Sequence, residues 1–189
     1  MKNTFTYIPC KLKQSVQKYY QVSLRAYHDW DHILDLTQKA RTHGIILQPA
    51  QELAILFHDS IYVPGSHLNE KMSAQLMRAM TGHLYSDAVI NTADAMIMDM
   101  SSHIPSVLGS DIVSDLDLLV LADMEEFEDS HSQVYDEYKY LVPAYEDFIK
   151  ARRAWATKFL ERDKIYHSQI LSHYESMARY NLKQFIEGK

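Results

Sequence analysis

Hydrophobic residues recur along the chain at spacings of three and four, the period of an amphipathic α-helix. In the segment 70–81, for example, Met72, Leu76, Met77 and Met80 share one side. No segment alternates strictly between apolar and polar residues, as a half-buried strand would. The period predicts helices over 11–24, 29–43, 49–59, 70–81, 87–99, 112–122, 130–141, 144–161 and 167–187. The pattern therefore predicts an all-α fold, a helical bundle.

Turn and capping residues set the expected ends of several helices. Pro49 suits the first position of a helix, and Asn69 and Ser86 are good N-caps for the segments that follow them. The residues 63–66 break the period with a Pro-Gly pair, and 101–111 contains Pro105 and Gly109. We expect loops at both places.

Composition narrows the class of protein further. The chain has 189 residues, of which 47% are hydrophobic and 23% charged, with only five glycines and five prolines. These values are typical of one globular domain, which we expect to span residues 1–189. The scarcity of glycine and proline favours long helices over a turn-rich β fold.

Charge and cysteine content exclude several partners and sites. The net charge is −6 and no Lys/Arg block is present, so no stable nucleic-acid complex is expected. The single Cys10 excludes a cysteine-rich zinc site. The longest apolar runs, Leu53–Phe57 and Leu118–Ala122, fall far short of the roughly 20 residues of a membrane span. Residues 1–13 lack the apolar core of a signal peptide. We therefore expect a cytoplasmic protein without a membrane partner.

Two histidines lie four residues apart where a helix is predicted to begin. His28 and His32 would share one face of that helix, one turn apart. Such a pair can bind a metal ion, or one imidazole can bind metal while the other faces the substrate. Two polar surface histidines would show the same spacing, so the pair alone does not decide between these interpretations.

A second pair, His58–Asp59, ends the strongly apolar segment that starts at Leu53. Buried His and Asp side chains are costly unless they are paired or bind a metal. A carboxylate at the C-terminal end of a helix also opposes the helix dipole, which a bound cation would offset. The context of this pair therefore favours a metal site.

A carboxylate could complete the set from a third helix. Asp115 and Asp117 begin another apolar segment, where acidic residues are also favoured by the helix dipole alone. With His32, His58 and Asp59, either one would give a site of imidazoles and carboxylates. Such mixed ligands suit Mn, Fe, Co, Ni or Zn better than Mg. A bound ion of this kind activates water and polarises a phosphoryl oxygen.

The order His…His-Asp…Asp on separate helices resembles the signature of the HD superfamily of phosphohydrolases. More narrowly, the chain resembles the predicted metal-dependent HD phosphohydrolases of bacteria. The resemblance runs from about residue 20 to residue 183. Its matched stretches are Arg25–Ile33, Leu53–Tyr62, Asn69–Ala74 and Ala178–Leu182.

The resemblance implies a single HD-type domain, with a metal-site core at about 20–125 and C-terminal helices at about 130–187 packed on it. It implies hydrolysis of a small phosphate ester such as a nucleotide through a metal-activated water. The metal ligands would be His32, His58, Asp59 and Asp117, with Asp59 also taking part in catalysis. His28 would protonate the leaving oxygen, and the substrate would contact Arg25, Glu70 and His103.

Several alternatives stay open at this point. Leu116 stands where the family usually has Ala, so Asp115 competes with Asp117 as the last ligand. Arg25 could make a salt bridge, Glu70 could simply complement a helix dipole, and His103 could be a loop histidine or bind a second metal. A non-catalytic HD module that senses nucleotide or metal would carry the same motifs. A di-iron oxygenase would need further ligands. A homodimer is a possible assembly.

Overall fold

The computed structural model describes residues 5–188, and this part of the chain contains helices and no strand. The α-helices are α1 (Cys10–Tyr20), α2 (Trp30–Thr42), α3 (Pro49–Phe57), α4 (Asn69–Thr81), α5 (Asp87–Asp99), α6 (Ser110–Leu118), α7 (Met124–Tyr138), α8 (Tyr145–Leu160) and α9 (Glu175–Glu187). Two short 3₁₀ helices are η1 (Leu119–Ala122) and η2 (Ser172–Tyr174). The all-α prediction is confirmed. Residues 1–4 and 189 of the expected domain lie outside the described residues.

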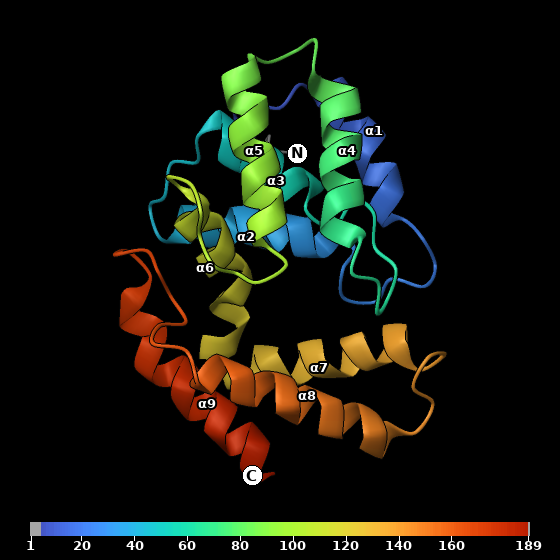
Figure 1. Ribbon diagram of the computed structural model, residues 1–189, viewed down its shortest axis with the longest axis vertical. Coiled ribbons are helices and arrows are strands. Elements are labelled where there is room, and N and C mark those ends of the chain that lie inside the picture. Colours follow the sequence, from blue (N-terminus) through green and yellow to red (C-terminus); the bar gives the residue numbers. More distant parts are fainter. Residues whose placement is uncertain (1–4, 189) are drawn as a thin grey trace.

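Helix α3 forms the centre of the fold (Figure 1). Every residue from Ala50 to Phe57 is buried. This helix contacts α1, α2, α4, α5 and α6, so neighbours cover it on all sides. Its apolar sequence explains that position, because a helix that is hydrophobic all round must be buried.

The polar residues of α3 lie in its first turn and tie other segments to it. The Glu52 carboxylate accepts hydrogen bonds from the backbone N–H groups of Thr6 and Tyr7, each at 2.6 Å. The Gln51 side chain donates to the carbonyl of Gly109 at 2.9 Å. The start of α3 therefore fixes both the N-terminal segment and the loop before α6.

The last third of the chain lies below helices α1–α5 in Figure 1. There, α7 and α8 lie side by side, and α9 packs against α8. This part of the chain is held to α6 and η1 by buried polar contacts. The Tyr166 hydroxyl donates to the carbonyl of Leu118 at 2.9 Å, and the Asn181 amide donates to that of Leu121 at 3.0 Å. None of the helices between residues 5 and 188 combines the length and apolar character needed to cross a bilayer.

Several predicted helix ends are confirmed and others are wrong. Ser86 caps α5 as expected, with its side chain accepting from the N–H of Val89. Asn69 is not an N-cap but the first residue of α4, because its side-chain amide bonds both backbone groups of Val63 at 3.0 Å and closes the preceding loop. The helix expected at 130–141 begins earlier, since Asp123 caps α7.

The helix expected at 167–187 begins only at η2 and α9. The Glu175 carboxylate accepts from the N–H groups of Ile165 and Tyr166 at 3.0–3.1 Å, which holds the preceding segment in an irregular path. The segment 112–122 starts two residues earlier than expected, at Ser110, and its last turn tightens into η1.

Candidate metal centre

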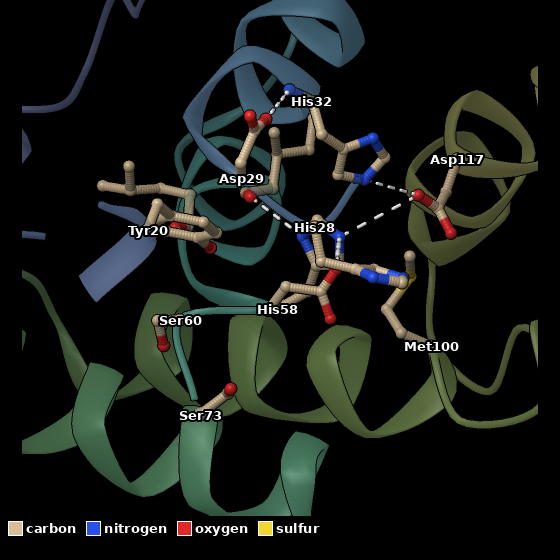
Figure 2. A network of polar contacts seen from close by, with 12 residues as sticks. Tyr20, His28, Asp29, His32, His58, Ser60, Ser73, Met100 and Asp117 are labelled. Carbon is tan, nitrogen blue, oxygen red and sulfur yellow. Dashed lines mark hydrogen bonds and ion pairs between the residues drawn. The ribbon is translucent and has the colours of Figure 1, made fainter. Parts of the chain in front are cut away.

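His32 and His58 come from two helix ends that meet beside α6 (Figure 2). The Asp29 side chain caps α2 by accepting from the N–H groups of Asp31 and His32, at 2.9 and 3.1 Å, which places His32 in the first turn. His58 directly follows the last residue of α3. Both histidines are buried, and their ring centroids lie 5.5 Å apart.

The hydrogen bonds of His58 define its tautomer. Its Nδ1 lies 3.0 Å from the carbonyl oxygen of Ile55, which can only accept, so Nδ1 carries the proton. In the neutral ring the lone pair therefore belongs to Nε2. This atom lies 3.1 Å from Oδ2 of Asp59 and 3.9 Å from Oδ1 of Asp117. The backbone of α3 thus turns Nε2 of His58 toward two carboxylates, the orientation that a metal ligand would need.

The ligand atoms of His32, His58 and Asp59 all lie within 4.8 Å of one another. Oδ1 of Asp117 lies 3.0 Å from Nε2 of His32 and completes the group. Nε2 of both histidines is buried and makes no hydrogen bond of acceptable geometry, although carboxylate oxygens are close. Two imidazole nitrogens and two carboxylate oxygens that converge in this way fit a divalent cation.

The charges of the centre are strongly coupled. Burial alone would raise the pKa of the Asp59 carboxyl, but the charges of His58 and His28 outweigh it and hold the pKa well below its usual range. Burial would lower the pKa of His58, but the charges of Asp59 and Asp117 raise it to about 9. The carboxylates therefore strongly favour positive charge at this position, which a metal cation would supply.

Of the two aspartates that compete for the last ligand position, only Asp117 lies at the centre. Asp115 is completely buried on another side of α6, where it accepts from the N–H groups of His167 and Ser168 at 2.9 and 2.7 Å. Two residues on a helix are separated by about 200° around its axis, so the two carboxylates cannot serve one site. Asp115 instead binds the C-terminal segment.

His103 contacts the other oxygen of Asp117. Its Nε2 lies 2.8 Å from Oδ2 of that carboxylate. The backbone of His103 has a φ of 53°, a conformation that non-glycine residues rarely adopt. Asp99 holds the surrounding turn by accepting from the N–H of Ser106 and the hydroxyl of Ser110. His103 is therefore placed to orient Asp117 and to face the cavity beside it.

His28 lies beside the centre and is held by Glu137 of α7. Its Nδ1 is 2.6 Å from Oε2 of Glu137, while Oε1 accepts from the N–H groups of Ala26, Tyr27 and His28, each at 2.9 Å. The His28 ring also stacks on Tyr62 with centroids 4.0 Å apart. With Nδ1 bound to the carboxylate, Nε2 is left for a ligand in the cavity.

Glu137 was not among the candidates that the sequence suggested. Burial would raise the pKa of its carboxyl, but the hydrogen bonds and charge of His28 lower it below the usual range. The available signal was its position, because Glu137 continues the buried face of α7 that includes Val134. A carboxylate on an apolar helix face requires a partner, but the sequence does not say which one.

Arg25 binds the backbone around the centre. Its guanidinium donates to the carbonyls of His28, Asp59 and Ser60 at 2.9, 2.5 and 3.1 Å, and lies over the ring of Tyr20. No carboxylate bridge to Arg25 is found among the described residues. The structure therefore assigns its donors to the two ligand-bearing segments and not to a phosphate in the cavity.

A cavity of about 500 Å³ opens on the centre and has the size of a small-molecule site. Glu70, at the start of α4, lines it, as do the three residues His28, His103 and Asp117. Most of the remaining wall is apolar or aromatic, and α7, α8 and the segment Leu118–Leu121 contribute much of it. The candidate metal-binding residues, the His28–Glu137 pair and a cavity large enough for a small molecule therefore lie together.

Comparisons with known protein families, with curated proteins and with solved structures found no match to this chain.

Proposed function

We propose that the protein is a metal-dependent phosphohydrolase that acts on a small phosphate ester such as a nucleotide. The observation that carries this proposal is the convergence of His32, His58 and Asp59 within 4.8 Å, next to Asp117, which lines the cavity. Asp117 and the His28–Glu137 pair add a fourth ligand and a proton-carrying group. The resemblance of the motifs to HD phosphohydrolases supports the same class.

In this proposal His32, His58, Asp59 and Asp117 hold one Mn, Fe, Co, Ni or Zn ion. When bound, that ion supplies an activated water and polarises the phosphoryl oxygen. His28 donates a proton from Nε2 to the leaving oxygen, and Glu137 keeps the ring in the required orientation and tautomer. The apolar wall from α7 and α8 excludes bulk water from the ester.

The experiment measures metal content and turnover of the protein loaded separately with Mn, Co, Ni and Zn, using a panel of nucleotides and p-nitrophenyl phosphate. We expect turnover with at least one metal, and loss of both metal and turnover in His58→Ala and Asp59→Ala. His83→Ala is the matched control, because His83 is exposed on another part of the surface.

Two results would change the proposal. Absence of metal binding in the parent protein would refute it entirely. Stoichiometric metal binding without turnover of any ester would instead favour a non-catalytic module that senses a metal or a nucleotide.

A further inference from the structure

The wall of the cavity that faces the candidate metal centre includes a guanidinium from α8. Arg152 lines the same cavity as His28 and Asp117, and its guanidinium carbon lies 4.2 Å from the centre of the Trp155 ring. The indole fixes the cation by a cation–π contact. Its Nε is buried and has no hydrogen-bond partner among the described residues.

The surroundings of Arg152 contain phenols and no paired carboxylate. Burial lowers the pKa of the guanidinium, and the ionisable groups that interact with it include the phenols of Tyr27, Tyr138 and Tyr62 and the imidazole of His131. A part-buried cation without a counter-ion is costly, because it loses hydration and gains no opposite charge. An anion in the cavity would supply that charge.

The tyrosines near Arg152 also contact the two histidines His28 and His32. Tyr62 stacks on the ring of His28, and Tyr27 lies against both His28 and His32 with ring centroids 5.0 and 5.1 Å away. Tyrosine hydroxyls can donate to the same anion that the guanidinium binds. The anion would therefore sit next to the group that delivers the proton.

Among residues 5–188, Arg153 and Arg162 also have a buried guanidinium nitrogen without a hydrogen-bond partner, but neither lines this cavity. Arg179 pairs with Glu175 and three backbone carbonyls, and Arg78 pairs with Asp94. Arg153, the neighbour of Arg152 in the sequence, borders a separate hollow with Tyr145 and Lys150 and does not line the cavity.

We propose that Arg152 is the phosphate-binding side chain of this cavity, held by Trp155 and assisted by the tyrosine hydroxyls around it. Its planar fork can bind two oxygens of one phosphoryl group. The substrate class follows from this chemistry as a phosphate ester with at least two free phosphoryl oxygens. The inference rests on the proposed function for the ester, but anion binding can be measured without turnover.

The test titrates inorganic phosphate into the full-length protein by calorimetry at constant ionic strength, in Mn-loaded and chelator-treated samples. We expect Arg152→Gln to weaken phosphate binding roughly tenfold or more, the loss typical of a hydrogen-bonded charge. Arg153→Gln is the matched control and should stay within about twofold of the parent protein, since this side chain points to another hollow.

Each further outcome has a defined meaning. Unchanged phosphate affinity in Arg152→Gln, or no phosphate binding by the parent protein in either state, overturns the inference. If Arg152→Gln does not fold, Arg152→Lys replaces it and should weaken binding because the two-oxygen contact is lost; equal affinity overturns the inference. The chelator-treated His58→Ala protein should still bind phosphate, because Arg152 is intact. A failure of the proposed metal site can therefore be distinguished from a failure of the proposed phosphate site.

Discussion

At the scale of single residues, the position of His28 depends on one carboxylate from a helix far along the chain. Glu137 is 109 residues further along the chain, yet it binds the ring nitrogen and the backbone N–H of His28 together. It thereby fixes both the position and the tautomer of the imidazole. Glu137 does not reach the cavity itself, since its side chain is fully buried, so it acts as a positioning residue.

Replacement of this carboxylate tests that role. We expect Glu137→Gln to lower turnover by about tenfold to a hundredfold, because the neutral amide no longer stabilises the protonated ring. The alkaline limb of the pH–rate profile, where a general acid loses its proton, should move to lower pH, a change that a purely structural role would not produce. Glu128→Gln on the exposed face of the same helix is the control. An unchanged pH profile in Glu137→Gln would contradict the role.

The sequence predicted the ligand residues better than their partners. His58 and Asp59 stand out because they end an apolar helix, and that signal is local. Glu137 and Arg152 lie on amphipathic helices whose contacts depend on how the last third of the chain folds back. No spacing in the sequence encodes that contact, so both were missed. The choice between Asp115 and Asp117 also required the orientation of α6.

At the scale of elements, the packing of α7 against α8 and α9 buries a histidine in an aromatic environment. His131 of α7 is buried among the rings of Phe127, Phe148 and Phe185. Neither of its ring nitrogens has a hydrogen-bond partner among residues 5–188. Burial and the charges of Arg152 and Arg153 on α8 lower its pKa to about 4.

This histidine makes the stability of the protein sensitive to acid. Its folded pKa of about 4 lies below the unfolded value of about 6.5, so folding favours the neutral ring. As the pH falls from about 6.5 toward about 4, the unfolded state binds a proton that the folded state does not. The free energy of unfolding therefore decreases through this pH range. We expect His131→Leu to raise the free energy of unfolding by roughly 1–3 kcal/mol, because two unpartnered nitrogens are removed.

Urea unfolding between pH 4 and pH 7 measures this effect, and the gain from His131→Leu should grow as the pH falls. His83→Leu, on an exposed position, controls for the loss of a histidine as such. A constant difference across this pH range would show that folding does not shift the pKa of His131.

The helices themselves were largely predictable, because their apolar residues follow the helical period. Their ends were less so. Asn69 and Glu175 both carry side chains that cap helices in other proteins, but here they bind backbone groups of the preceding loops. A local pattern cannot distinguish these two uses of the same side chain.

At the scale of the whole molecule, α6 connects the metal centre to the last third of the chain. Asp117 faces the histidines, and Asp115 binds the backbone of His167 and Ser168. One helix therefore carries a binding residue and an anchoring residue two positions apart. Movement of the C-terminal segment would act on the ligand set through this helix.

The two aspartates should separate binding from stability when each is replaced by asparagine. We expect Asp115→Asn to reduce the free energy of unfolding by about 1–3 kcal/mol, because charge-assisted hydrogen bonds to two buried N–H groups are weakened. Asp117→Asn should lose most of the metal affinity with a smaller effect on stability. Thermal unfolding and metal titration measure the two quantities, and loss of metal affinity in Asp115→Asn alone would reverse the assignment.

Helix α3, which has no exposed residue after Pro49, also determines how the centre can come apart. Its amide hydrogens have no local route to solvent and should exchange with deuterium only when the whole domain opens. His58 is fixed to the carbonyl of Ile55 in this helix, so the ligand set should persist until that event. The turn that carries His103 is partly exposed, so its amide hydrogens should exchange earlier than those of α3.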